Sequence, residues 1–107
     1  MIALAMLLAN TPVAKEGVYE WCKAPEESIK GLACTTFVTG VIGGAMEASR
    51  MQGTPTPTPF CIPSAVTQRG KETIVVAYLE KHPEFKGRDS AGIVVAAIHD
   101  AFPCGRR

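Results

Sequence analysis

Apolar residues between positions 29 and 48 recur at steps of three and four along the chain. Residues with this spacing lie on one face of an α-helix. The predicted apolar face comprises Ile29, Leu32, Ala33, Phe37, Gly40, Val41, Gly44 and Ala48. Pro25 suits a first helical turn, Glu26 and Glu27 complement the positive end of the helix dipole, and Gly53 is a suitable stop. The pattern therefore predicts one long helix.

Three glycines, Gly40, Gly43 and Gly44, stand inside this predicted helix, and two of them lie on its apolar face. Glycine is about 1 kcal/mol less favourable than alanine in a helix, so we expect another helix to cross closely at this point. A membrane dimer formed through a G-x-x-x-G pair is the alternative. Glu47, Arg50 and several threonines in the same segment favour close packing within a soluble core.

Two further helices are predicted towards the C-terminus. The first covers residues 66–81 and ends at His82 and Pro83; its apolar stripe is Ile74, Val75, Tyr78 and Leu79. A polar loop follows at 84–88, after which Asp89 or Ser90 can cap the second helix. The stripe of that helix is Ala91, Val94, Val95, Ile98, Ala101 and Phe102. Residues 17–22 are predicted as the last turns of a first helix, and no segment alternates convincingly as a strand does. We therefore predict an all-α fold of about four helices.

Residues 53–59 read Gly-Thr-Pro-Thr-Pro-Thr-Pro and are predicted to be extended, because alternating prolines are incompatible with a helix interior. The pattern favours a semi-rigid linker. The alternative is an exposed, pre-ordered loop that docks on a partner. In that case the contacts would come from polar side chains in the loop and at the preceding helix end, namely Glu47, Gln52, Thr54, Thr56 and Thr58.

The 107-residue chain has a net charge of +1, with 47% hydrophobic and 20% charged residues. This length is typical of one domain, and the composition is that of a globular protein. A charge so close to zero gives no support for nucleic-acid binding.

Residues 1–9 form a continuous apolar run that is followed, after a short polar stretch, by Ala14 and Lys15. The run is too short to span a membrane but suits the apolar part of a signal peptide. We interpret residues 1–14 as a signal-peptide remnant, and residues 15–107 as a single helical domain without a membrane span. Because no basic residue precedes the run, an apolar N-terminal helix packed on the core is the alternative.

The chain contains an even number of cysteines, Cys22, Cys34, Cys61 and Cys104, and no two of them have C-x-x-C spacing. This usage favours two disulfides and an exported protein. A mixed cysteine–histidine zinc site is the alternative, but His82 and His99 lack ligand spacing relative to the cysteines. We therefore expect no metal and no cofactor.

The predicted helices suggest how the cysteines pair. If the last two helices form an antiparallel hairpin, Cys61 before it and Cys104 after it meet at its open end. Cys22 ends the first helical segment, and Cys34 lies in the first turns of the next helix, so a short connection can bring the two within disulfide reach. The predicted pairs are Cys22–Cys34 and Cys61–Cys104.

The sequence offers no convincing catalytic constellation. His99 and Asp100 are adjacent, so their side chains diverge on a helix. His82, Glu84 and Asp89 lie near one loop, but no serine or free cysteine is evidently paired with them. We therefore predict a protein that acts by binding and is not an enzyme.

Four blocks of sequence carry a family resemblance: 34–41 (CTTFVTGV), 60–63 with 66–68 (FCIP and VTQ), 75–83 (VVAYLEKHP) and 97–104 (AIHDAFPC). In this order they resemble the Rap/Tai family of immunity proteins, which is linked to type VI secretion. The resemblance covers residues 18–104. Phe37 departs from it, since the family often has tyrosine there, as do Gly43 and Gly44, where a more acidic ending is usual.

This resemblance implies a periplasmic, all-helical protein that binds and inhibits a peptidoglycan amidase toxin. A periplasmic helper or chaperone-like binding protein of the same fold, without a toxin partner, is the alternative. Both a monomer and a homodimer remain open as the binding form.

Overall fold

The computed structural model describes residues 17–51 and 59–104. These residues form four α-helices and no strand: α3 (Val18–Lys23), α4 (Ile29–Met51), α5 (Gln68–Lys81) and α6 (Ser90–Ala101), with a short 3-10 helix, η1 (Pro83–Phe85), before α6. The predicted all-α fold is confirmed. The predicted signal-peptide remnant at 1–14 lies outside the described residues, as do Gln52, Gly53, Thr54, Thr56 and Thr58.

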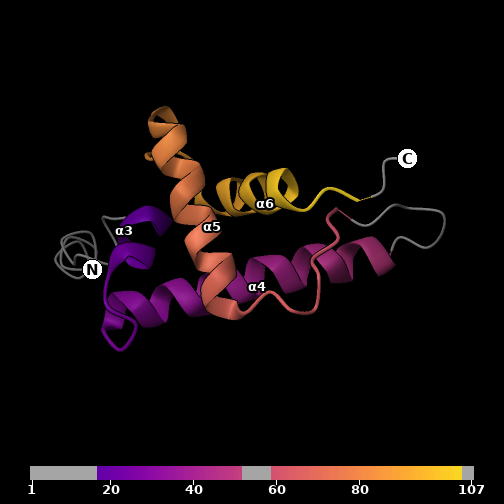
Figure 1. Ribbon diagram of the computed structural model, residues 1–107, viewed down its shortest axis with the longest axis horizontal. Coiled ribbons are helices and arrows are strands. Elements are labelled where there is room, and N and C mark those ends of the chain that lie inside the picture. The colour runs from indigo at the N-terminus through magenta and orange to yellow at the C-terminus, as the bar shows by residue number, and fades with distance from the viewer. Residues whose placement is uncertain (1–16, 52–58, 105–107) are drawn as a thin grey trace, which may run out of the picture.

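The long helix α4 forms a base on which the other helices pack (Figure 1). The short helix α3 folds back beside the N-terminal half of α4, α5 crosses over the middle of α4, and α6 lies above the same helix. The core lies between these elements. Its largest fully buried side chains are Val18, Cys34, Val38, Phe60, Val75, Leu79, Val94 and Ile98.

Side-chain caps fix where α5 and α6 begin. The Thr67 hydroxyl accepts a hydrogen bond of 3.0 Å from the Gly70 N–H, and the Asp89 carboxylate accepts one of 3.2 Å from the Gly92 N–H. Both satisfy a backbone donor that the first helical turn leaves unpaired. The cap at Asp89 was one of the two predicted. The cap at Thr67 explains why α5 begins at Gln68, two residues later than predicted.

The predicted apolar face of α4 is wrong for most of its residues, although Phe37 and Val41 are partly buried against the core. The buried positions are Gly31, Cys34, Val38, Ile42 and Ser49. By contrast, Ile29 and Leu32 from the predicted face are 75% and 57% exposed. A Cβ atom built on Gly40, Gly43 or Gly44 would meet nothing within 4 Å. No described helix therefore crosses closely at these glycines.

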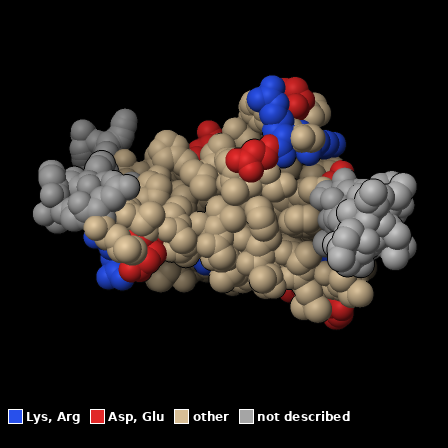
Figure 2. Space-filling model, turned by 180° about the vertical axis from the view of Figure 1, so that it is seen from behind, with Lys and Arg blue, Asp and Glu red and all other residues tan. Residues whose placement is uncertain are grey.

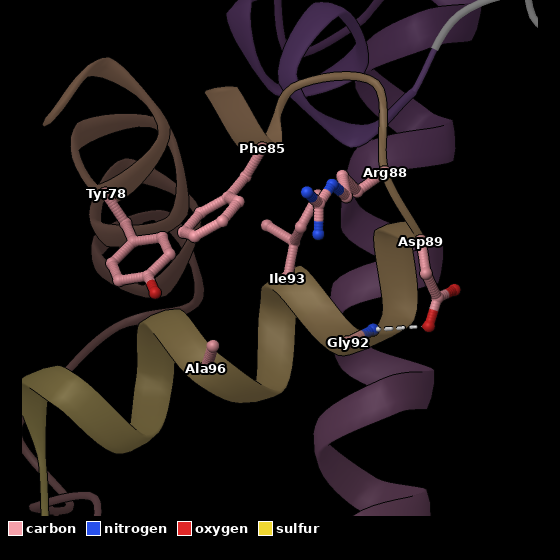
Figure 3. A pocket seen from close by; sticks show the side chains of 7 residues that line it. All are labelled: Tyr78, Phe85, Arg88, Asp89, Gly92, Ile93 and Ala96. Carbon is pink, nitrogen blue, oxygen red and sulfur yellow. Dashed lines mark hydrogen bonds between the residues drawn. The ribbon is translucent and has the colours of Figure 1, made fainter. Parts of the chain in front are cut away.

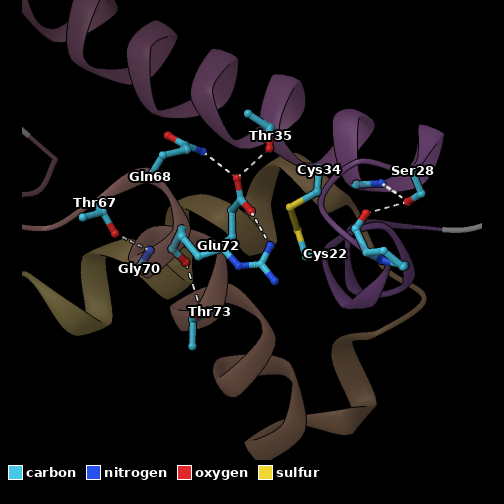
Figure 4. A network of polar contacts seen from close by, with 12 residues as sticks. Cys22, Ser28, Cys34, Thr35, Thr67, Gln68, Gly70, Glu72 and Thr73 are labelled. Carbon is cyan, nitrogen blue, oxygen red and sulfur yellow. Dashed lines mark hydrogen bonds and ion pairs between the residues drawn. A yellow bond between two sulfur atoms is a disulfide. The ribbon is translucent and has the colours of Figure 1, made fainter.

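The close approach occurs at Gly31 instead. A Cβ atom on Gly31 would lie 2.8 Å from the carbonyl oxygen of Glu26 and still closer to that of Pro25. Pro25 is therefore part of a turn packed on α4 and not of its first helical turn. Ser28 holds this turn, because its hydroxyl donates to the Pro25 carbonyl at 2.6 Å and accepts from the Gly31 N–H at 3.0 Å (Figure 4).

Both predicted disulfides are confirmed, Cys22–Cys34 and Cys61–Cys104, each with a Cα–Cα distance of 4.9 Å. They differ in their surroundings. Cys22 and Cys34 are 7% and 1% exposed and belong to the core, whereas Cys61 is exposed and Cys104 is half-buried. The first bond therefore also contributes to packing, while the second lies at the surface.

The reason we gave for the Cys61–Cys104 pairing is wrong, because α5 and α6 run in different directions and do not form an antiparallel hairpin (Figure 1). Cys61 reaches Cys104 because the chain passes beside the end of α6 before it continues to the start of α5. There the Cys61 N–H donates to the Phe102 carbonyl at 2.9 Å. The adjacent Phe60 ring is fully buried and anchors the segment.

A buried carboxylate joins α5 to α4. Glu72 is 3% exposed. Its Oε2 atom accepts hydrogen bonds from the Thr35 hydroxyl of α4 at 2.8 Å and from the Gln68 amide at 3.0 Å (Figure 4). Its Oε1 atom lies 3.5 Å from the Arg69 guanidinium. Three donors thus compensate for the loss of water around this acid, as a buried charge requires.

We expect Glu72→Ala to lower the free energy of unfolding by about 2 kcal/mol, because it removes hydrogen bonds to a charged group and leaves their donors unpaired. Chemical denaturation would measure the change. Glu80→Ala is the matched control on the same helix. Glu80 is half-exposed; it accepts a hydrogen bond of 3.1 Å from the Tyr19 hydroxyl and contacts Lys23 at 3.5 Å, and such exposed contacts each contribute under about 1 kcal/mol. Equal losses for the two variants would show that the bridge to α4 is not important for stability.

Candidate functional site

Glu47, a predicted partner-binding residue, is exposed near the C-terminal end of α4. It pairs with Arg50, whose Nη2 atom lies 2.6 Å from its Oε1 atom. The hydrogen bond and the negative charge of Glu47 raise the pKa of Arg50. The two opposite charges cancel, so this turn of α4 carries no net charge from the pair. The other predicted partner-binding residues, Gln52, Thr54, Thr56 and Thr58, lie outside the described ranges.

A pocket of about 270 Å³ opens where the end of α5, η1 and the start of α6 meet. Residues from all three elements and from the loop between η1 and α6 line it; Phe85 and Ile93 point toward one another, whereas the Asp89 carboxylate turns to the Gly92 N–H (Figure 3). The lining residues are Tyr78, Phe85, Arg88, Asp89, Gly92, Ile93 and Ala96. This hollow is the best-formed candidate site among the described residues.

Aromatic rings form one side of the pocket. Tyr78 and Phe85 have nearly parallel rings whose centroids are 6.3 Å apart, and the His82 ring lies 4.6 Å from Tyr78 and 5.6 Å from Phe85. These distances are within the range of favourable aromatic pairs. The opposite side consists of Gly92 and Ala96, one helical turn apart, which keep α6 free of bulk there.

The two charged residues of the pocket differ in their availability. The Asp89 carboxylate accepts the capping hydrogen bond from Gly92. The Arg88 guanidinium lies 5.6 Å from the Phe85 ring centroid and forms no ion pair with any residue in the described part of the chain. The pocket therefore combines apolar walls with one available cation.

Sequence reasoning missed this pocket. It assigned Tyr78 to the core stripe of its helix and Phe85 to a polar loop. One signal was present: Tyr78, His82 and Phe85 are spaced four and three residues apart, as residues on one helical face are. The three rings lie together in the structure, with centroids 4.6–6.3 Å apart.

A metal site or a thiolate nucleophile would draw on the titratable groups of the described residues. Within 17–51 and 59–104, no group of three or more histidine, cysteine, aspartate or glutamate side chains is placed to hold a metal ion. His82 Nδ1 lies 3.8 Å from Glu84, without a nucleophile beside it. The four cysteine sulfurs are bonded in pairs, so none is available as a thiolate. The geometry of the pocket suits binding.

Comparison with known families gives a match to the Rap1a immunity proteins over residues 15–104. The chain belongs to this family. No curated protein and no solved structure is significantly similar to it. The match agrees with the predicted Rap/Tai resemblance and covers all four helices described above. Membership of the Rap1a family indicates a role in toxin immunity, with a toxin as the partner.

In this Rap1a-family chain, α4 is long and apolar enough to cross a membrane, judged by length and composition alone. Core helices of soluble proteins meet the same criterion. One face of α4 is joined to the remaining helices, since Cys34 is bonded to Cys22 and Thr35 to Glu72. The opposite face carries the three glycines and the exposed apolar residues Ile29, Leu32 and Met51.

Proposed function

We propose that the protein is a periplasmic immunity protein that binds and inhibits a peptidoglycan amidase toxin of a type VI secretion system. The observation that carries this proposal is the family match over residues 15–104. Two disulfides support the location, because such bonds persist in oxidising compartments such as the periplasm. Inhibition would follow from occupation of the cleft of the toxin.

Rigidity of the fold favours this function. The Cys22–Cys34 bond joins α3 to α4, and the Cys61–Cys104 bond joins the segment before α5 to the end of α6. A pre-ordered surface loses little conformational entropy when it binds. We propose that Glu47, Gln52, Thr54, Thr56 and Thr58 contribute polar contacts to the toxin.

A pull-down from periplasmic extract with the oxidised protein tests the proposal. We expect it to capture an amidase whose hydrolysis of peptidoglycan falls as the protein is added and stops at a fixed molar ratio. That ratio, with the mass of the complex, also distinguishes a monomeric from a homodimeric inhibitor. Alanine at Gln52, Thr54 and Thr56 should weaken inhibition while the fold is retained. A captured amidase that keeps full activity at saturation would refute the inhibitor role.

A helper or chaperone-like role is the second candidate, and one observation favours it. Ile29, Leu32 and Met51 expose 75%, 57% and 76% of their surface on α4. A helper would use such apolar surface to hold unfolded polypeptides. In that case the protein should suppress the aggregation of an unrelated unfolded protein, and Leu32→Ser should reduce the effect. Inhibition of an amidase without such suppression would decide against this role.

A further inference from the structure

The pocket between α5, η1 and α6 has the size of a site for a single side chain. Its volume of about 270 Å³ is below the roughly 300–1,000 Å³ of sites that enclose drug-sized ligands. It is open at the surface and lined by residues from three consecutive elements, so a side chain projecting from a partner can enter it.

The walls of the pocket favour a flat apolar group. The ring planes of Tyr78 and Phe85 lie within 17° of parallel. Ile93 extends an aliphatic side chain from α6 toward Phe85 (Figure 3). A Cβ atom on Gly92 would lie 3.1 Å from the Asp89 carboxylate, so a larger residue here would require that side chain to shift. The space facing the rings is thus kept open by small residues, and an aromatic ring can pack there against other rings.

The charge beside the pocket favours an acidic neighbour for that ring. Arg88 is exposed at its edge and has no acidic partner among the described residues, whereas Asp89 is occupied by its cap. Figure 2 shows charged side chains gathered at the end of the molecule where α5 ends, while the middle of the face has few. A guanidinium that lies over an aromatic ring is positioned to receive a carboxylate.

We propose that this pocket is an anchor site for the toxin, taking an aromatic side chain that is followed by an acidic residue which pairs with Arg88. The inference rests on the proposed function and adds a contact that the segment at 47–58 does not supply. Aromatic side chains in small pockets and arginines are the groups that dominate binding energy in protein interfaces. An interface of ordinary size has room for both contacts.

Two probes test the anchor site. The first is N-acetyl-Phe-Glu-amide, titrated into the isotope-labelled oxidised protein while amide NMR shifts are followed. We expect saturable shifts at Gly92 and Ala96, which N-acetyl-Ala-Glu-amide does not produce. Ala96→Leu fills the pocket and should abolish the shifts. Arg88→Gln, an exposed change that does not threaten folding, should weaken binding about tenfold.

The second probe is the amidase captured by the oxidised protein. Ala96→Leu and Arg88→Gln should each raise its Kd about tenfold or more. Ala101→Leu is the matched control, an exposed alanine on the same helix outside this pocket, and should leave the Kd unchanged. If neither pocket variant changes the Kd while the amidase is still inhibited, the anchor site is refuted and the proposed function stands. If no amidase is captured, the proposed function fails, and absence of peptide shifts would refute the anchor separately.

Discussion

Gly31→Ala should lower the free energy of unfolding by about 3 kcal/mol, although alanine is normally the better helix residue. The added methyl group would overlap the carbonyl oxygens of Pro25 and Glu26, which are backbone atoms and have no rotamer by which to move away. Overpacking of this kind costs about 1–3 kcal/mol and more where the neighbours are rigid. Chemical denaturation of both proteins, with the m-value of the wild type used for each, would measure the difference in the free energy of unfolding.

Gly40→Ala is the matched control on the same helix. A Cβ atom there meets nothing within 4 Å, so the variant should be more stable than the wild type by about 0.5–1 kcal/mol. The same is expected of Gly44→Ala. The change in the free energy of unfolding should therefore have opposite signs for Gly31→Ala and Gly40→Ala. A destabilising Gly40→Ala together with a neutral Gly31→Ala would show that the packed face of α4 is the one the apolar pattern suggested.

The second large effect is expected from the surface disulfide. Replacing both Cys61 and Cys104 by alanine should lower the free energy of unfolding by about 4 kcal/mol, because the bond closes a loop across 43 positions of sequence. Neither sulfur is deeply buried, so little packing is lost besides. Denaturation of the double variant, compared with the oxidised wild type, would measure the loss.

Stepwise reduction supplies a control that needs no substitution. Because Cys61 is exposed while Cys22 and Cys34 lie in the core, a thiol reductant should open Cys61–Cys104 at concentrations that leave Cys22–Cys34 intact. Trapping and mass mapping of the free thiols would give the order. A stability loss below about 1 kcal/mol in the double variant would mean that Phe60 alone fixes this segment.

Local sequence signals predicted the helices well. The Asp89 cap and the Pro83 stop each act on their nearest neighbours, so they could be recognised without knowledge of the fold. The face of α4 could not be chosen in this way, because small and apolar residues occur on all its sides. The predicted disulfide of Cys34 could have identified the buried face of α4. A disulfide to α3 requires Cys34 to face the domain, and Val38 and Ile42 then follow it at helical spacing.

The candidate pocket was harder to predict than the helices, for a different reason. It depends on the angle at which α5 meets α6, and the expected hairpin would have laid the two helices side by side. The two helices instead cross (Figure 1), and Tyr78 and Phe85 lie across the pocket from Gly92 and Ala96 (Figure 3). Only the tertiary arrangement shows that these residues form one surface.

The covalent connectivity of the molecule has a consequence for how it can be divided. The two disulfides close separate rings, one from Cys22 to Cys34 and the other from Cys61 to Cys104, and neither ring spans the chain between Met51 and Phe60. A break inside either ring leaves every part of the protein in one molecule. A break between the rings yields two fragments held together by non-covalent contacts: the packing of α5 and α6 on α4 and of α5 on α3, the Thr35–Glu72 hydrogen bond, and the hydrogen bonds from α3 to Glu80 and Ser90. Cleavage between Met51 and Phe60 would therefore separate a fragment with α3 and α4 from one with α5 and α6, each retaining its own disulfide.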